Sequence, residues 1–93
     1  MSNQKFASVW DALEDTSPEA ENMKLRSKLM MALEEHLTRN GMNQAEAAKL
    51  LGVTQPRVSD LMRGKINLFG LDALVNMATA AGLQVEMRVR KAA

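Results

Sequence analysis

The sequence predicts a mainly α fold, a small bundle of four to five helices that ends in one C-terminal β-strand. Along residues 17–82, apolar residues recur at intervals of three and four, and glycines and capping residues divide this pattern into short segments. Over residues 83–90, apolar and polar residues alternate instead, which is typical of a half-buried strand. We therefore divide the chain into an N-terminal acidic segment (1–16), a helical domain (17–82) and a C-terminal strand with a basic tail (83–93).

The first segment carries a short apolar stripe. Phe6, Val9, Trp10 and Leu13 have the spacing of one helix face, which predicts a short amphipathic helix over 6–14. This stripe is either a satellite of the core or an element that docks on a partner.

A long helix follows. The sequence Thr16-Ser17-Pro18-Glu19 is typical of a helix start, with Thr16 or Ser17 as N-cap and Glu19 completing a capping box with Thr16. The apolar stripe of this helix has a strict spacing of four and consists of Leu25, Leu29, Leu33 and Leu37. We expect the helix to end at Asn40-Gly41, because glycine readily adopts the left-handed conformation of a C-terminal cap.

Two short helices come next. Asn43 and Glu46 predict a capped start for the first helix, which ends at Gly52. Thr54 caps the second, with Pro56 in its first turn, and this helix ends at Gly64. The predicted inner positions of the pair are Ala47, Ala48, Leu50, Leu51, Val53, Val58, Leu61 and Met62.

A connector over 65–70 leads to the last helix and the strand. Leu71, Leu74, Val75, Ala78 and Ala81 form a helical stripe that Gly82 closes. Met77 is expected to fill the core, like Met62 in the preceding helix.

The two short helices have the spacing of a helix-turn-helix. Ala48, Gly52 and Val58 fall at relative positions 0, 4 and 10. A small residue at position 48 lets the helices cross closely, Gly52 permits the positive φ of the sharp turn, and Val58 packs the second helix onto the first.

Residues 44–65 resemble the Xre (lambda-repressor-like) helix-turn-helix regulators, and the longer stretch from Ser8 to the final strand resembles the HigA-type antitoxin branch of that family. The resemblance implies a lambda-repressor-like fold and a bacterial or phage-encoded, dimeric protein that binds an operator and often represses its own operon. Pro56 departs from the family pattern, since a long polar side chain is common at that position.

The second helix of such a motif enters the major groove of DNA. Base-reading residues are then predicted to be Gln55, Pro56, Arg57 and Asp60, where glutamine suits adenine, arginine suits guanine and proline can touch only a thymine methyl. Asp60 accepts from cytosine or orients Arg57 or Arg63. The residues predicted to contact phosphates are Gln44, Thr54, Ser59, Arg63 and Lys65.

A lone strand leaves unpaired edges that recruit a partner. The simplest partner is a second copy, so the strand predicts a homodimer built on Leu83, Val85, Met87 and Val89. Such a dimer would hold two recognition helices about 34 Å apart, which suits a pseudo-palindromic double-stranded DNA operator.

The charge and the composition limit the function. Residues 1–22 hold one basic and five acidic residues, whereas residues 23–93 hold eleven basic and six acidic residues, which permits a polyanion partner for the body of the chain. Without cysteine we expect no disulfide and no thiolate metal site, and one histidine cannot build a zinc site alone, so we expect no metal site. DNA recognition needs no cofactor, so we expect none. No catalytic acid–base pair or glycine-rich phosphate loop is found, so we expect no enzyme. No apolar run approaches the ~20 residues of a membrane span.

Two functions remain. The first is a cytoplasmic transcriptional regulator, associated with the nucleoid when bound to DNA, that acts as antitoxin and autorepressor of a type II toxin–antitoxin operon. The alternative is a protein-interaction module that uses the helix-turn-helix only as scaffold and neutralises a toxin, or docks on another partner, without meaningful DNA binding. A cognate toxin would bind the strand or the acidic N-terminal segment.

Overall fold

The computed structural model describes residues 17–92 and confirms the mainly α fold. Over these residues it contains the α-helices α2 (Pro18–Arg39), α3 (Gln44–Leu51), α4 (Gln55–Met62) and α5 (Leu71–Ala80), and one 3₁₀ turn, η1 (Ile66–Leu68). The amphipathic helix predicted over 6–14 lies outside the described residues.

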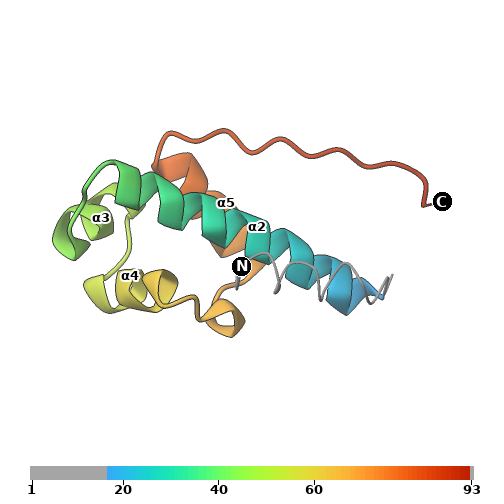
Figure 1. Cartoon of the computed structure of the whole chain (residues 1–93), viewed down its shortest axis with the longest axis horizontal. Helices are drawn as coiled ribbons and strands as arrows, with labels where there is room; N and C mark the ends of the chain where they lie inside the picture. The colour runs from blue at the N-terminus through green and yellow to red at the C-terminus, as the bar shows by residue number, and fades with distance from the viewer. Residues whose placement is uncertain (1–16, 93) are drawn as a thin grey trace.

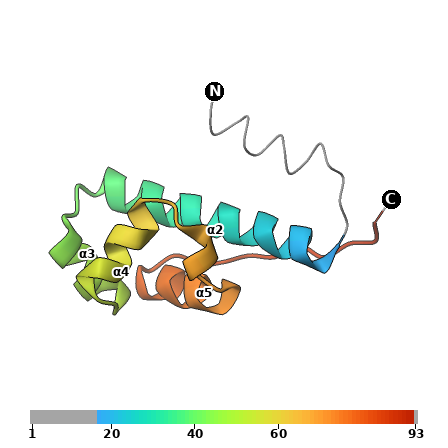
Figure 2. The ribbon, with the colours of Figure 1, turned by 90° about the horizontal axis from the view of Figure 1, so that it is seen from below.

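The long helix α2 runs along the length of the bundle (Figure 1). Helix α5 packs against it, α3 packs against α4, and α3 also contacts α5. Seen from below, α4 and α5 lie on the same side of α2 (Figure 2). The helix-turn-helix therefore lies at one end of the molecule, whereas the chain after α5 runs along the bundle toward the N-terminal end of α2.

Local signals in the sequence determine where the helices begin. Of the two predicted caps of α2, Ser17 caps it, and its Oγ accepts a hydrogen bond from the Ala20 N–H at 3.2 Å. Thr16 lies outside the described residues. The predicted capping box of α3 is confirmed, because Asn43 accepts from the Glu46 N–H at 2.8 Å and Glu46 accepts from the Asn43 N–H at 3.0 Å.

The core lies between α2, α3, α4 and α5 beside η1. Its largest fully buried side chains are Phe69, Leu33, Leu37, Leu61, Leu74 and Val58. The predicted leucine stripe of α2 is only partly right, since Leu25 is 39% exposed and Met30 is buried in the core instead. A spacing of four advances about 40° beyond a full turn at each step, so a strict stripe winds away from the core.

Two further details of the predicted core are corrected by the structure. Met62 is 39% exposed, because it is the last residue of α4 and lines a surface pocket beside Met31 and Glu34. Phe69, which the sequence placed in a connector, is fully buried. The η1 turn directly precedes Phe69 and brings its ring into the core. The prediction that Met77 is buried is confirmed.

The predicted C-terminal strand is absent from the described residues. After Gly82 the chain continues as the C-terminal segment (residues 83–92), which the structure leaves without a strand or a pairing partner. Alternating side chains favour extended backbone, but a ladder also needs a second strand, and residues 17–92 bring none beside it. None of the helices in this described part is long and apolar enough to span a membrane.

Candidate nucleic-acid interface

The sharp turn between α3 and α4 depends on Gly52. This residue has φ +71°, and the N–H of the following Val53 donates to the Ala48 carbonyl at 3.0 Å. A Cβ built on Gly52 would meet no atom within 4 Å, so the backbone conformation and not lack of space favours glycine. The predicted turn is confirmed.

The inner faces of the two helices pack as predicted. Ala47, Ala48 and Leu51 of α3 are buried, and so are Val58 and Leu61 of α4. Because apolar contacts fix one face of α4 on the bundle, its opposite face is held outward as a rigid unit.

The N-terminal end of α4 points polar groups into solvent. Thr54 caps the helix, and its Oγ1 accepts from the Arg57 N–H at 3.4 Å. This bond leaves the hydroxyl proton of Thr54 available to a phosphate oxygen. Gln55 and Pro56 are exposed in the first turn, as the predicted base-reading role requires.

Arg57 turns back onto the bundle. Its guanidinium carbon lies 4.0 Å from the centroid of the Phe69 ring, and its Nη1 donates to the Leu68 carbonyl at 2.7 Å. The residue is half-buried, although its position on α4 is that of an outward-facing reader. A guanidinium has five N–H groups, so Arg57 retains donors beyond the one bonded to Leu68.

A second arginine contacts the same loop, residues 66–69, through its backbone carbonyls. Nη1 of Arg26, on α2, lies 3.4 Å from the Phe69 carbonyl and 3.5 Å from the Ile66 carbonyl. Sequence reasoning missed Arg26. The signal was present, because Arg26 lies four residues before the buried Met30 and so continues the core-facing stripe of α2 with a basic residue.

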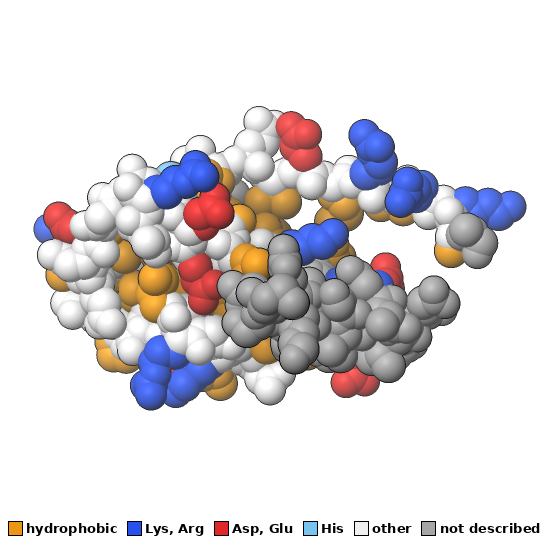
Figure 3. All heavy atoms as spheres, in the orientation of Figure 1, with side chains coloured by type: hydrophobic (Ala, Val, Ile, Leu, Met, Phe, Trp, Pro, Cys, Tyr) orange, Lys and Arg blue, Asp and Glu red, His pale blue; other side chains and the backbone are white. Residues whose placement is uncertain are grey.

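The C-terminal end of α4 gathers basic side chains. Lys65 pairs with Asp60 at 3.4 Å, so Asp60 meets neither Arg57 nor Arg63 as its ion-pair partner. Arg63 is exposed at the end of the helix. Figure 3 shows basic side chains gathered at the edge of the molecule where α4 lies.

The remaining predicted phosphate contacts flank this surface. Gln44 is exposed as the first residue of α3, and Ser59 is half-buried on α4. Within residues 17–92, the side chains of Gln55 and Arg63 form no hydrogen bond or ion pair. The outer face of α4 thus has the exposed Gln55 at its N-terminal end and the basic Arg63 and Lys65 at its C-terminal end.

Known proteins are similar to this chain in sequence and in fold. A family model described as a helix-turn-helix domain (HTH_37) matches residues 12–90. A solved structure described as an XRE family transcriptional regulator is 35% identical to this chain, with 81% of this chain and 84% of that chain covered at a TM-score of 0.74. No curated protein matches. The family match spans most of the sequence, and the solved structure shares both sequence and fold, so the chain belongs to the XRE family of helix-turn-helix proteins.

Proposed function

We propose that this protein is a sequence-specific DNA-binding transcriptional regulator that lays α4 in the major groove. The observation that carries the proposal is the outer face of α4, where the exposed Gln55 and Arg63 form no side-chain bond to the bundle. Family membership supports the same function, since the solved relative is described as a transcriptional regulator.

Within this function the base edges are read by the first turns of α4. Gln55 is the leading reader, because it is exposed and its amide can bond adenine at two atoms. Pro56 offers an apolar contact to a thymine methyl. Arg57 bonds a guanine through the N–H groups that do not donate to the Leu68 carbonyl. Asp60 accepts from a cytosine while it stays paired with Lys65.

Phosphate contacts position the helix and carry no sequence information. Arg63 and Lys65 supply positive charge at one end of α4, and the hydroxyl of Thr54 reaches a phosphate at the other. Gln44, at the N-terminal end of α3, contacts a phosphate beside free backbone N–H groups. Ser59 is the weakest member of this set, because it is half-buried.

A gel-shift series on the promoter of the protein's own gene tests the proposal. We expect Gln55→Ala to weaken binding to the operator at least about tenfold and to change random-DNA binding little, because one bidentate base contact contributes about 1–3 kcal/mol. Arg63→Ala should weaken both equally and lower the salt slope by about 1, because it removes one phosphate contact.

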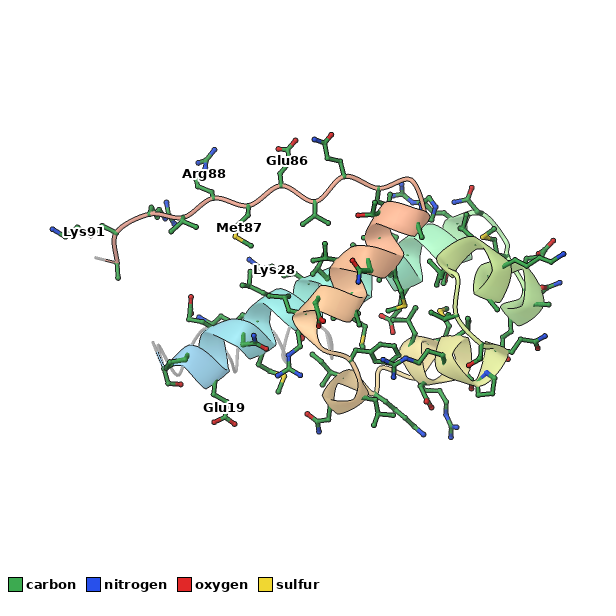
Figure 4. The ribbon with its side chains drawn as sticks, turned by 180° about the vertical axis from the view of Figure 1, so that it is seen from behind. Glu19, Lys28, Glu86, Met87, Arg88 and Lys91 are labelled. Atoms are coloured by element: carbon green, nitrogen blue, oxygen red, sulfur yellow. The ribbon has the colours of Figure 1, made fainter. Side chains whose placement is uncertain are left out.

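Lys91→Ala is the matched control for Arg63→Ala. It makes the same charge change at the far end of the C-terminal segment from α4 (Figure 4) and should leave the salt slope nearly unchanged. If wild type binds its promoter no more tightly than random DNA, the regulator proposal fails and the scaffold alternative takes its place.

The finer role of antitoxin and autorepressor is part of this proposal and rests on the sequence resemblance alone. An antitoxin must have a toxin encoded beside it, so a small neighbouring open reading frame should encode a protein that co-purifies with this chain. Its expression alone should arrest growth, and co-expression of this chain should restore growth. A neighbouring product that is harmless and does not bind would reject the antitoxin role while leaving DNA binding intact.

A further inference from the structure

The loop of residues 66–69 is bonded by an arginine on each side. Arg26 of α2 reaches two of its carbonyls, at 3.5 Å for Ile66 and 3.4 Å for Phe69. The carbonyl of Leu68, which lies between them in the chain, accepts from Arg57 of α4 at 2.7 Å. Carbonyls of one short loop therefore connect the long helix α2 with the helix that we propose reads DNA.

Arg26 is not explained by packing. The residue is half-buried, and its Nε is buried without a hydrogen-bond partner. None of the carboxylates in residues 17–92 forms an ion pair with it. Withdrawing a charge from water without an acid partner costs free energy that an apolar side chain of similar size would not cost. What the guanidinium adds at position 26 is its bonds to the loop.

A continuous set of bonds leads from Arg26 to Arg57. The Ile66 carbonyl that Arg26 contacts also accepts from the Phe69 N–H at 3.2 Å. This N–H and the Leu68 carbonyl belong to the same planar peptide group, so fixing one fixes the direction of the other. Arg57 is bonded to that carbonyl, and its guanidinium carbon lies 4.0 Å from the centroid of the Phe69 ring. A loop released from Arg26 would therefore also release the acceptor that holds Arg57.

We infer that Arg26 is a positioning residue for base reading, which keeps Arg57 ordered before DNA arrives. The inference rests on the proposed function, because it takes Arg57 as the reader of a guanine. A free arginine side chain samples many rotamers, and ordering it during binding lowers the affinity. The contacts with Leu68 and Phe69 order Arg57 in advance, while its other N–H groups stay available for O6 and N7 of the guanine.

Base-preference profiles test this inference. Competition binding measures the affinity of the full chain for every single-base variant of its own promoter site. Arg57→Ala should remove the preference for guanine at one position. Arg26→Met should lower the preference at that same position about three- to tenfold and leave the position read by Gln55 unchanged. These ratios are insensitive to a fraction of unfolded protein, because unfolded chains lower all apparent affinities alike.

A double variant separates positioning from a merely structural role. In the Arg57→Ala background, Arg26→Met should change the profile no further, because the side chain that it positions is gone. A structural Arg26 would weaken binding to all sites evenly in both backgrounds. Lys28→Met is the matched control. It removes the same charge from α2 at an exposed side chain without a hydrogen bond or ion pair in residues 17–92, and should leave the profile as in wild type.

A measurement without DNA tests the ordering itself. The NMR order parameter of the Arg57 Nε–H should fall in Arg26→Met and stay unchanged in Lys28→Met. Circular dichroism verifies the helices of each variant. If Arg26→Met does not fold, Arg26→Lys decides in its place, because it keeps the charge but replaces the flat fork of donors by one ammonium group. Its expected loss at the same position is about twofold.

The outcomes distinguish this inference from the proposed function. A folded Arg26 variant that leaves the order parameter or the profile unchanged, or that weakens all positions evenly, would overturn the inference and leave the regulator proposal standing. So would an Arg57→Ala profile equal to that of wild type. A wild type that binds every sequence equally would overturn the proposed function and, with it, the role of Arg26 in base reading.

Discussion

The helical bundle (residues 17–82) and the C-terminal segment differ in how far the chain alone completes them. In the bundle, the apolar faces of α2 to α5 meet in one core, and two arginines hold the carbonyls around η1. In the C-terminal segment, backbone groups have no ladder partner within the described chain, and the apolar residues become more exposed toward the end. The comparison teaches that the bundle buries its own apolar residues, whereas the C-terminal segment leaves most of its apolar residues exposed.

The largest expected effect lies in the bundle. Phe69→Ala should lower the free energy of unfolding by about 3–5 kcal/mol, because it leaves a cavity in the core and removes the ring beneath Arg57. Urea denaturation measures this loss. Leu68→Ala is the control, since Leu68 is 49% exposed and its loss should cost far less. Equal losses for both variants would mean that Phe69 is not a core residue.

The next effect concerns the surface of α4. Arg57→Ala should cost about 1–2 kcal/mol of stability, because it removes a hydrogen bond and a cation–π contact. Arg63→Ala removes the same charge from an exposed position without such contacts and should stay within about 0.5 kcal/mol of wild type. If the two variants unfold at the same denaturant concentration, the contact of Arg57 with the loop contributes nothing.

A substitution in the C-terminal segment should change how stability depends on protein concentration and should leave the stability of the single chain unchanged. The melting temperature of wild type should rise with protein concentration, because association stabilises the folded chain by mass action. Val89→Ser should abolish most of this dependence yet match wild type in dilute solution, since Val89 is 85% exposed. Differential scanning fluorimetry over a wide concentration range measures both. If Val89→Ser has a lower melting temperature than wild type even in dilute solution, Val89 stabilises the single folded chain and not an association between chains.

The smallest effect is pH-dependent. Burial raises the pKa of the Glu34 carboxyl, so the folded state favours its protonated form. The stability contributed by this group is present at acid pH and is lost as the pH rises through the raised pKa. Glu34→Gln should therefore melt slightly above wild type at neutral pH, and the difference should vanish in acid. Glu35→Gln, at an exposed neighbour paired with Arg39, should show no such gain.

Local signals made the helices and their turn predictable from the sequence. The capping box at Asn43 and Glu46, the left-handed Gly52 and the buried pair Val58 and Leu61 each depend on residues close in the chain. Most of the predicted DNA-facing residues, such as Gln55 and Arg63, lie at exposed positions for the same reason, since the inner face of a short helix determines its outer face.

Long-range contacts account for what the sequence did not predict. The burial of Phe69 and the contacts of Arg26 join residues about forty positions apart. The spacing of Arg26 from Met30 places it on the core-facing side of α2 but does not specify which carbonyls it contacts. The attachment of Arg57 to the loop is of the same kind. The missing strand has another cause, because period-two alternation favours an extended chain but does not supply a second strand for it to pair with.

The attachment of Arg57 to Leu68 and Phe69 also constrains how this protein can diversify. If Arg57 reads the operator as proposed, a new side chain at position 57 changes operator preference and weakens the fold in the same step, so such a change needs compensation elsewhere before it can persist. Gln55 carries no such burden, because its exposed side chain forms no hydrogen bond or ion pair with the rest of the described residues. New operator choices should therefore arise first at the tip of α4, while position 57 changes slowly.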